Sequence, residues 1–358
     1  MAFFRQGVVQ RVVDELPDLV RVDVELEDGT TCGADGFPSM LGRIEAGHRV
    51  VVNTTGIELS LGTGGRAFVL WDLDAPAPVP DAPGHIVKMR YTPWQTEVLA
   101  AEEDTSPHHR ALATAESLDG MPVVACGLHS QVPAVAAGIR AISEDARIGY
   151  LMTDGAALPL AWSDLVRRSR AAGLLDVTAT CGHAFGGDLE TVNVFSGLVA
   201  LRHAARADVA IVAMGPGVVG TSTALGFTAI EQGQVLDAAA ALGGRAVACL
   251  RVSFADPRER HRGVSHHTLT ALRVAAREPA AVVVPELGDA TEGLLSQLAG
   301  LPERHGIHLE DPAPGKATLR ASGVPVASMG RSLDDVPETF AAAVAAGTFA
   351  ARLLDTLT

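Results

Sequence analysis

Histidine and carboxylate side chains follow apolar segments in the second half of this chain. A glycine-rich segment holds His183 and Asp188, and Asp154 directly follows another apolar run. A histidine with a partner carboxylate can act as a general base or bind a metal ion. We therefore take His183 as a candidate acid/base, with Asp188 and Asp154 as its carboxylates. The alternative is that Asp188 only caps a helix that begins near Leu189.

A dense basic segment follows a further apolar run and carries three candidate anion-binding side chains, Arg258, Arg262 and His266. Guanidinium groups bind phosphate or carboxylate through two parallel hydrogen bonds. The chain has a formal net charge of -14, so this concentration of positive charge suggests a local use. The alternative is a solvated charged loop in which Ser265 caps a helix.

The histidine-rich segments also offer nitrogen ligands for a divalent metal ion such as Zn, Mn or Fe. His261 is a candidate acid/base or ligand. His266 and His267 are adjacent on a predicted helix, so their side chains point in different directions and only one of them should join His261 on a metal. The sequence leaves open whether a metal is bound. The candidate ligands are His129, His183, Asp188 and His267.

A glycine-rich motif follows the apolar segment 209–214 and fits the G-x-G-x-x-G pattern of dinucleotide-binding loops. Backbone N–H groups of such a loop can approach a phosphate at the start of a helix. The acidic residue needed about 20 positions further on would be Asp237, which falls inside a predicted helix. The alternative is that the glycines only allow a tight turn. The candidate anion-binding residues are Gly215, Gly217, Gly220 and Thr221.

Three segments that differ in composition and in hydrophobic pattern must position these residues. Residues 5–72 alternate apolar and polar side chains with the period of β-strands, which predicts a small N-terminal β-barrel over 1–73. The segment 74–83 contains four prolines, which predicts a stiff linker. Residues 84–358 then form an α/β domain that carries the predicted site.

The α/β prediction rests on short apolar segments that alternate with Ala-rich helical ones. This pattern favours a mostly parallel, doubly wound, Rossmann-like sheet with helices on both faces. Parallel strands end at one edge of a sheet, so we expect 180–190, 214–222 and 256–268 to meet around one anion-binding cleft. The predicted strands are 85–91, 122–126, 148–152, 177–181, 209–214, 246–252 and 281–284. The predicted helices include 163–172, 191–205, 236–242 and 337–357.

Composition and sequence patterns limit the cellular compartment and the kinds of partner expected for this protein. With 28 basic against 42 acidic residues, a nucleic-acid partner is electrostatically disfavoured. Residues 209–230 are uncharged and long enough to cross a membrane, but their glycines and proline indicate a strand, a loop and a helix start. The four cysteines form no C-x-x-C pair and no secretory signal is visible, which predicts a cytoplasmic protein. Because twofold dimers are the commonest assemblies, we expect a homo-oligomer of this kind.

Several of these segments occur together in one bacterial family. They are NTT at 53–55, LGTGG at 61–65, RYTP at 90–93, MTDGAALP at 152–159, GHAFGGDLE at 182–190, MGPGVVGT at 214–221 and RGVSHHT at 262–268. Together they resemble the uncharacterised family catalogued as domain of unknown function 3866. The resemblance extends from about Phe4 to past Pro285, and it implies no reaction, cofactor or catalytic residue.

Two function classes remain from the residues. The first is an enzyme of hydrolase or transferase type that acts on a small anionic, phosphorylated substrate. The second is a non-catalytic nucleotide or anion sensor, or an assembly scaffold. Loops that converge with perturbed acids would favour the enzyme, and dispersed loops would favour the sensor. The barrel lacks an aromatic stripe, so it is disfavoured as a nucleic-acid module.

Overall fold

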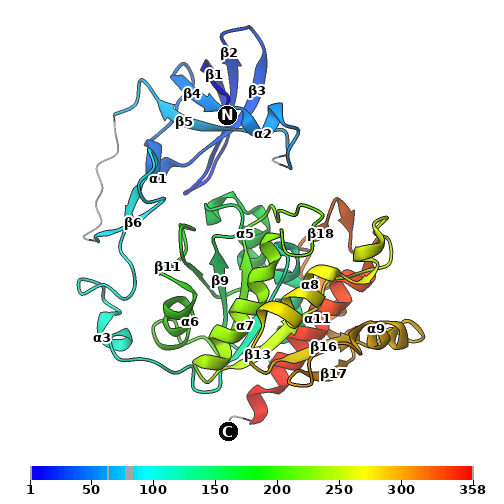
Figure 1. Cartoon of the computed structure of the whole chain (residues 1–358). Coiled ribbons are helices and arrows are strands. Elements are labelled where there is room, and N and C mark those ends of the chain that lie inside the picture. Colours follow the sequence, from blue (N-terminus) through cyan, green and yellow to red (C-terminus); the bar gives the residue numbers. More distant parts are fainter. Residues whose placement is uncertain (1, 63, 77–83, 357–358) are drawn as a thin grey trace. The chain divides into compact units, whose positions relative to one another are not determined.

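The computed structural model describes residues 2–62, 64–76 and 84–356. It divides into two compact units, Met1–Ala82 and Pro83–Thr358. Most of the predicted Pro-rich linker lies at 77–83, outside the described residues, and the domain boundaries stay a prediction. Each unit is described below by itself (Figure 1).

The N-terminal unit is a closed barrel of five strands in the order β1-β2-β3-β5-β4, with β3 and β5 parallel. This order is the topology of the OB-fold, a five-stranded Greek-key barrel. Alternate residues of β2 point inward, so Val20, Val22 and Val24 are buried in its core. The barrel elements are β1 (Phe4–Glu15), β2 (Val20–Leu26), β3 (Thr31–Gly36), α1 (Pro38–Leu41), β4 (Arg49–Asn53), α2 (Thr55–Glu58) and β5 (Ala67–Asp72).

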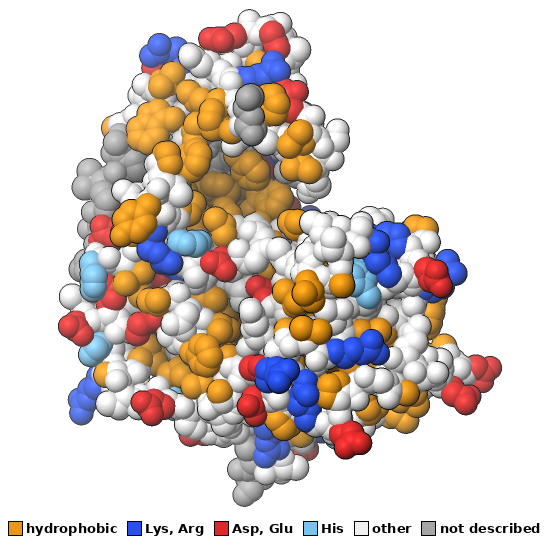
Figure 2. Space-filling model, in the orientation of Figure 1, with side chains coloured by type: hydrophobic (Ala, Val, Ile, Leu, Met, Phe, Trp, Pro, Cys, Tyr) orange, Lys and Arg blue, Asp and Glu red, His pale blue; other side chains and the backbone are white. Residues whose placement is uncertain are grey.

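Exposed apolar side chains lie on the outside of the barrel, where Figure 2 shows orange surface. Phe4 and Trp71 are about half exposed. They belong to β1 and β5, which both pair with β4 and therefore lie two strands apart. Phe37 is instead buried and stacks on Phe68 with ring centroids 6.3 Å apart. The aromatic side chains therefore form no continuous stripe along one strand.

The C-terminal unit contains a sheet of eight parallel strands in the order β11-β10-β9-β12-β8-β13-β16-β17. The α/β class with a preceding barrel, predicted from the sequence, is confirmed. Strands β8, β9, β10 and β12 are buried along their whole length and β13 and β16 along all but their first residue, as expected for strands covered on both faces. Their bounds are β8 (Pro122–Ala125), β9 (Ile148–Thr153), β10 (Val177–Thr180), β11 (Leu189–Glu190), β12 (Val209–Met214), β13 (Arg245–Cys249), β16 (Ala281–Pro285) and β17 (Gly306–Glu310).

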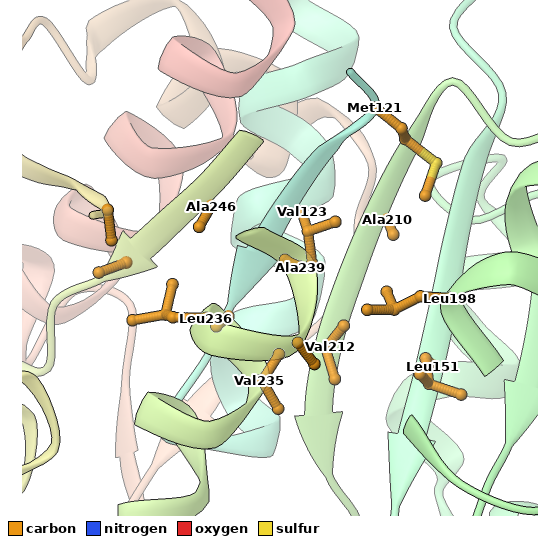
Figure 3. Close-up of a cluster of buried hydrophobic side chains, with 14 of the residues drawn as sticks. Met121, Val123, Leu151, Leu198, Ala210, Val212, Val235, Leu236, Ala239 and Ala246 are labelled. Carbon is orange, nitrogen blue, oxygen red and sulfur yellow. The ribbon is translucent and has the colours of Figure 1, made fainter. Parts of the chain in front are cut away.

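Helices cover both faces of the sheet and divide its core into two layers. Side chains of α6, α7 and α9 pack on one face with Leu151 and Val212, as Figure 3 shows for part of this cluster. Side chains of α4, α5, α10 and α11 pack on the other face with Tyr150 and Ile211. The helices are α4 (Val132–Ile142), α5 (Asp164–Ala171), α6 (Val194–His203), α7 (Glu231–Ala241), α9 (Ala290–Leu298), α10 (Ala313–Ala321) and α11 (Pro337–Arg352).

Short elements complete the unit. The segment before the sheet holds the hairpin β6 (Ile86–Lys88) and β7 (Thr96–Val98), in place of the single strand predicted at 85–91. No helix of the described residues is long and apolar enough to cross a membrane. The remaining elements are α3 (His109–Leu112), η1 (His129–Gln131), η2 (Leu160–Trp162), η3 (Thr228–Ile230), β14 (Val252–Ser253), η4 (Glu259–His261), β15 (Gly263–Val264), α8 (His266–Thr270), the π-helical turn η5 (Ala271–Ala275), β18 (Ala327–Ser328), β19 (Arg331–Ser332) and η6 (Leu354–Thr356).

Candidate functional site

The strand order creates a switch point between β9 and β12, which pair in parallel. After β9 the chain continues through α5 to β10, on one side of the pair. After β12 it continues through α7 to β13, on the other side. The helices α5 and α7 also cover opposite faces of the sheet. Loops that diverge in this way leave a crevice beyond the carboxyl ends of the strands, where α/β sheets bind ligands.

A partly buried carboxyl, Glu231, stands at this switch point at the start of α7. The hydroxyl of Thr153, the last residue of β9, donates a hydrogen bond of 2.6 Å to its Oε1. Burial raises the pKa of Glu231 to about 7; the Thr153 hydrogen bond opposes this shift and the neighbouring charge of Asp154 adds to it. Glu231 therefore changes protonation state near neutral pH.

Asp154 and His183, both predicted from the sequence, come together here. The backbone N–H of His183 donates to Asp154 Oδ2 at 2.8 Å. The imidazole itself faces another segment, because its Nδ1 accepts a hydrogen bond of 3.1 Å from the backbone N–H of Met89. His183 Nε2 lies 3.5 Å from Arg90 Nη2, so both ring nitrogens face protein N–H donors.

The glycine-rich loop after β12 differs from its prediction. It does not open a helix, because the next α-helix starts only at Glu231. A side chain on Gly215 would place a Cβ 2.3 Å from the carbonyl oxygen of Ala157, so glycine is needed there for close packing of two loops. Thr221 bonds within its own loop, to Gly226. The prediction that this loop opens a helix is therefore wrong, and anion binding by Gly215, Gly217, Gly220 and Thr221 stays a prediction.

The basic loop between β13 and α8 surrounds three histidines with arginines. Asp256 is buried and accepts a bidentate pair of hydrogen bonds from Arg258, at 2.9 and 2.8 Å. This ion pair holds the pKa of Asp256 far below its usual range. The side chain of Arg251 is also buried, 3.9 Å from Asp256, and burial lowers its pKa to about 10. Arg262 is exposed to solvent.

The three histidines His261, His266 and His267 lie together at the base of this loop. Each ring has a nitrogen that lies within 4.8 Å of a nitrogen of each of the other two rings. The rings of the adjacent pair therefore do not point apart as expected, and which of them could share a metal with His261 stays a prediction. His266 and His267 form the first turn of α8, and their ring centroids are only 4.5 Å apart. In Figure 2, basic and histidine side chains gather over the region that the yellow 256–268 loop occupies in Figure 1.

Contacts join the basic loop to the glycine-rich loop and to the segment that leads into Glu231. Arg260 Nη2 donates to Ser222 Oγ at 3.3 Å. The ring of Phe227 stacks on that of His267, with centroids 4.0 Å apart and planes at 3°. Phe227 precedes η3, whose end leads directly into Glu231. The segments 214–222 and 256–268 are thus in contact, and the single cleft that would also include 180–190 stays a prediction.

Asp188 lies away from the carboxyl edge, contrary to its prediction. Its Oδ2 accepts hydrogen bonds of 2.8 and 3.0 Å from the N–H and hydroxyl of Thr178, near the beginning of β10. Arg170 donates to its other oxygen. The predicted helix start near Leu189 is also wrong, because Leu189 and Glu190 form strand β11 and pair in parallel with β10. A residue just before β11 must therefore lie beside the start of β10.

His129 is a structural histidine rather than a free ligand. Its Nδ1 lies 3.1 Å from the carbonyl oxygen of Met214, and its Nε2 lies 2.7 Å from Ser163 Oγ. Burial lowers the pKa of His129 to about 4. Ser163 caps α5 and accepts from the N–H of Val166, so its hydroxyl is also committed to the fold. Both ring nitrogens of His129 therefore have protein partners, and metal binding by this residue stays a prediction.

Sequence reasoning missed Glu231, Thr153 and Arg251 as site residues. A signal was present for Thr153 and Arg251, since each lies at or just after the end of a buried strand. Glu231 was hidden because the predicted helix began at 236, five residues after its true start. A carboxyl in the first turn of the helix that follows β12 would have been a candidate.

The raised pKa of Glu231 predicts a pH-dependent stability. The folded protein binds this proton more tightly than the unfolded chain, so the free energy of unfolding should fall as the pH rises from 4.5 to about 7. Glu231→Gln removes the charge and keeps an acceptor for Thr153. At pH 8 we expect this variant to be more stable than the parent by about 2 kcal/mol, with little difference at pH 4.5. Urea unfolding at both pH values measures this.

The exposed Glu286 provides the matched control, because Glu286→Gln removes the same charge without relieving burial. An equal gain at pH 8 for both variants would show that net charge, and not the burial of Glu231, is responsible.

Comparison with known proteins gives a family but no activity. No curated protein matches the chain. A family model described as "Protein of unknown function (DUF3866)" matches residues 34–347. The match begins within β3 of the barrel, so it omits β1 and β2, and it includes almost all of the α/β unit. The chain therefore belongs to the family of domain of unknown function 3866.

Proposed function

We propose that the α/β unit is an enzyme of hydrolase or transferase type that acts on a small anionic, phosphorylated substrate. One observation carries this proposal. The carboxyl of Glu231 lies at the switch point between β9 and β12 and has a pKa of about 7. General acids and bases work best when their pKa is close to the working pH. We therefore assign proton transfer to Glu231.

The neighbours of Glu231 support this role. Thr153 occupies Oε1 of Glu231 with its hydroxyl and fixes the orientation of the carboxyl. Asp154 is close enough for its charge to raise the pKa of Glu231. Two carboxyl groups in different environments, one partly buried and one exposed, are the usual basis for separate acid and base roles.

The basic loop supports an anionic substrate. Arg251, Arg258 and Arg260 all lie close enough to the histidine cluster to lower the pKa of His266. Arg258 is committed to Asp256, so Arg260 is the arginine we assign to the substrate anion. Its present contact with Ser222 places it between the basic and the glycine-rich loops. A phosphate group accepts several such charge-assisted hydrogen bonds at once, and this favours a phosphorylated ligand.

The test is turnover by the purified full-length chain. Phosphate release is followed from nucleotides, sugar phosphates and p-nitrophenyl phosphate across pH 5 to 9, with and without added divalent cations. We expect at least one substrate to be hydrolysed with a pH dependence near 7, and Glu231→Gln to lower kcat/KM by about 10²- to 10⁴-fold. Glu310→Gln is the matched control, because Glu310 is a buried carboxyl on β17 that pairs with Arg352.

Two results would contradict the proposal. Full activity of Glu231→Gln would remove Glu231 from the chemistry. Binding of these compounds without turnover, seen as a rise in Tm with concentration, would support the anion sensor instead. The homodimer and the cytoplasmic location stay predictions.

A further inference from the structure

The three histidines of the basic loop, which we call the histidine cluster, have no part in the proton transfer assigned to Glu231. His261 ends η4, and His266 and His267 begin α8, so two separate elements bring the three rings together. Ring centroids are 4.5 to 4.8 Å apart. Within the described part of the chain, this is the one group of three or more His, Cys, Asp or Glu side chains whose ligand atoms are close enough to hold a metal ion.

Hydrogen bonds hold both ring nitrogens of His261 and one of His267, and the buried Nε2 of His266 has none. His261 Nδ1 lies 2.7 Å from Ser265 Oγ, and its Nε2 accepts from Arg260 Nε at 3.5 Å, a contact that a metal ion at Nε2 would have to replace. His267 Nδ1 accepts from Arg251 Nη1 at 3.3 Å. His266 Nε2 is buried and has no hydrogen-bond partner. A buried polar atom without a partner costs about 1–3 kcal/mol, so an occupant that satisfies this nitrogen would stabilise the fold.

We propose that His261, His266 and His267 bind one divalent transition-metal ion, with Zn²⁺ the best match. Three imidazoles with an open fourth position are a common ligand set of catalytic zinc sites. Nitrogen ligands exclude Ca²⁺ and Mg²⁺ as preferred occupants, since these ions favour oxygen. The site is adjacent to the chemistry assigned to Glu231 and does not depend on it.

The protonation state of the rings suits a metal. Burial, followed by the charges of nearby arginines, lowers the pKa of His261 to about 4 and that of His267 to about 3. Burial likewise lowers the pKa of His266. Only neutral imidazole binds a metal, so no proton would have to be displaced from imidazolium at pH 7.

Binding requires a small closure of the cluster. Tetrahedral zinc with Zn–N distances of about 2.0–2.1 Å places its ligand nitrogens roughly 3.4 Å apart, closer than the present limit of 4.8 Å. If His267 binds the metal through Nε2, the ring proton moves from Nε2 to Nδ1. The hydrogen bond that Arg251 donates to Nδ1 is then lost. Asp256, 3.9 Å from Arg251, remains as the acidic neighbour of this arginine. Phe227 stacks on His267 and contacts His266 edge-on, so it limits the orientations of both rings.

The arginines predict what fills the fourth position. Arg251, Arg258 and Arg260 outnumber the one acidic partner of this loop, Asp256, so a dication alone adds to an excess of positive charge. An anionic fourth ligand, such as hydroxide or phosphate, offsets that excess. Inorganic phosphate should therefore tighten metal binding, because it binds both to the metal and near the arginines.

Metal binding by the untagged full-length chain tests the proposal. After treatment with EDTA and dialysis, Zn²⁺ is titrated by calorimetry and Co²⁺ by visible absorbance. We expect one ion per chain, a tetrahedral Co²⁺ spectrum, and tighter binding with phosphate. His266→Ala and His266→Gln should each weaken binding by about 100-fold or more. His308→Ala is the matched control, because His308 is exposed on β17.

Circular dichroism and Tm of each variant without metal establish that it is folded. Unchanged affinity in both folded His266 variants would overturn the proposal, as would an equal loss in His308→Ala or the absence of saturable binding to the parent. None of these readouts uses turnover, so failure here leaves the assignment of Glu231 standing, and failure of turnover leaves the metal site standing.

Discussion

Replacing Gly347 with alanine is expected to destabilise the protein by about 4 kcal/mol, a large part of the stability of a typical domain. Gly347 lies on α11 where this helix crosses α4, and a Cβ added there would lie 2.0 Å from the carbonyl oxygen of Val135. The contact is reciprocal, because a Cβ on Gly138 of α4 would lie 2.2 Å from the carbonyl oxygen of Val344. Backbone atoms cannot rotate away as a side chain does, so the two helices would have to separate.

Equilibrium unfolding in urea measures this effect, and Gly293→Ala is its control. Gly293 lies inside α9, where an added Cβ meets no atom within 4 Å. There alanine should stabilise the protein by about 0.5–1 kcal/mol, because it loses less backbone entropy on folding than glycine does. If Gly347→Ala were as stable as the parent, α4 and α11 would not pack as closely as described.

Lys88→Met should cost about 3–5 kcal/mol, since it removes one partner of a buried ion pair. Lys88 is completely buried; its Nζ donates to the carbonyl oxygen of Thr191 at 2.8 Å and lies 3.3 Å from Glu190 Oε2. The substitution leaves a partly buried carboxylate and a carbonyl group without their cation. It also loosens the β6 segment, which this ion pair ties to β11.

The chain contains one other lysine, Lys316, which is only partly buried on α10. Lys316→Met should change the free energy of unfolding by less than about 0.5 kcal/mol. The double variant Lys88→Met/Glu190→Gln should recover part of the loss, because it also removes the unpaired charge. Independent, additive effects of the two substitutions would show that Lys88 and Glu190 do not act as a pair.

The parts of the fold that the sequence predicted are those with an all-buried apolar pattern. Strands β8, β9, β10 and β12 are buried along their whole length and were found within a residue or two. Strand β17 was missed because four of its five residues are exposed at the edge of the sheet, so it has no apolar run. Strand β11 has only two residues and is defined by its pairing with β10, which no local pattern reveals.

The same difference between local pattern and long-range pairing explains which site residues could be predicted from the sequence. Asp154 and His183 follow buried strands, so their meeting could be predicted from the topology. The position of Asp188 depends on the register of β11 against β10, which is a long-range property. His266 and His267 converge with His261 although they are adjacent, because they occupy the first turn of a short helix that starts beside η4. The rule for side chains on a longer helix did not apply there.

The place of β12 in the sheet has a consequence for how the chain folds. Strands β8 and β9 are consecutive among the parallel strands, yet they do not pair, because β12 lies between them and pairs with both. The centre of the sheet therefore cannot assemble in the order in which the ribosome delivers it. Until residues 209–214 have emerged, β8 has no neighbour on that side and β9 has only β10. Closing such long loops is entropically costly and slow, so the middle of this sheet is completed late and its unpaired strand edges stay open to chaperones or to aggregation meanwhile.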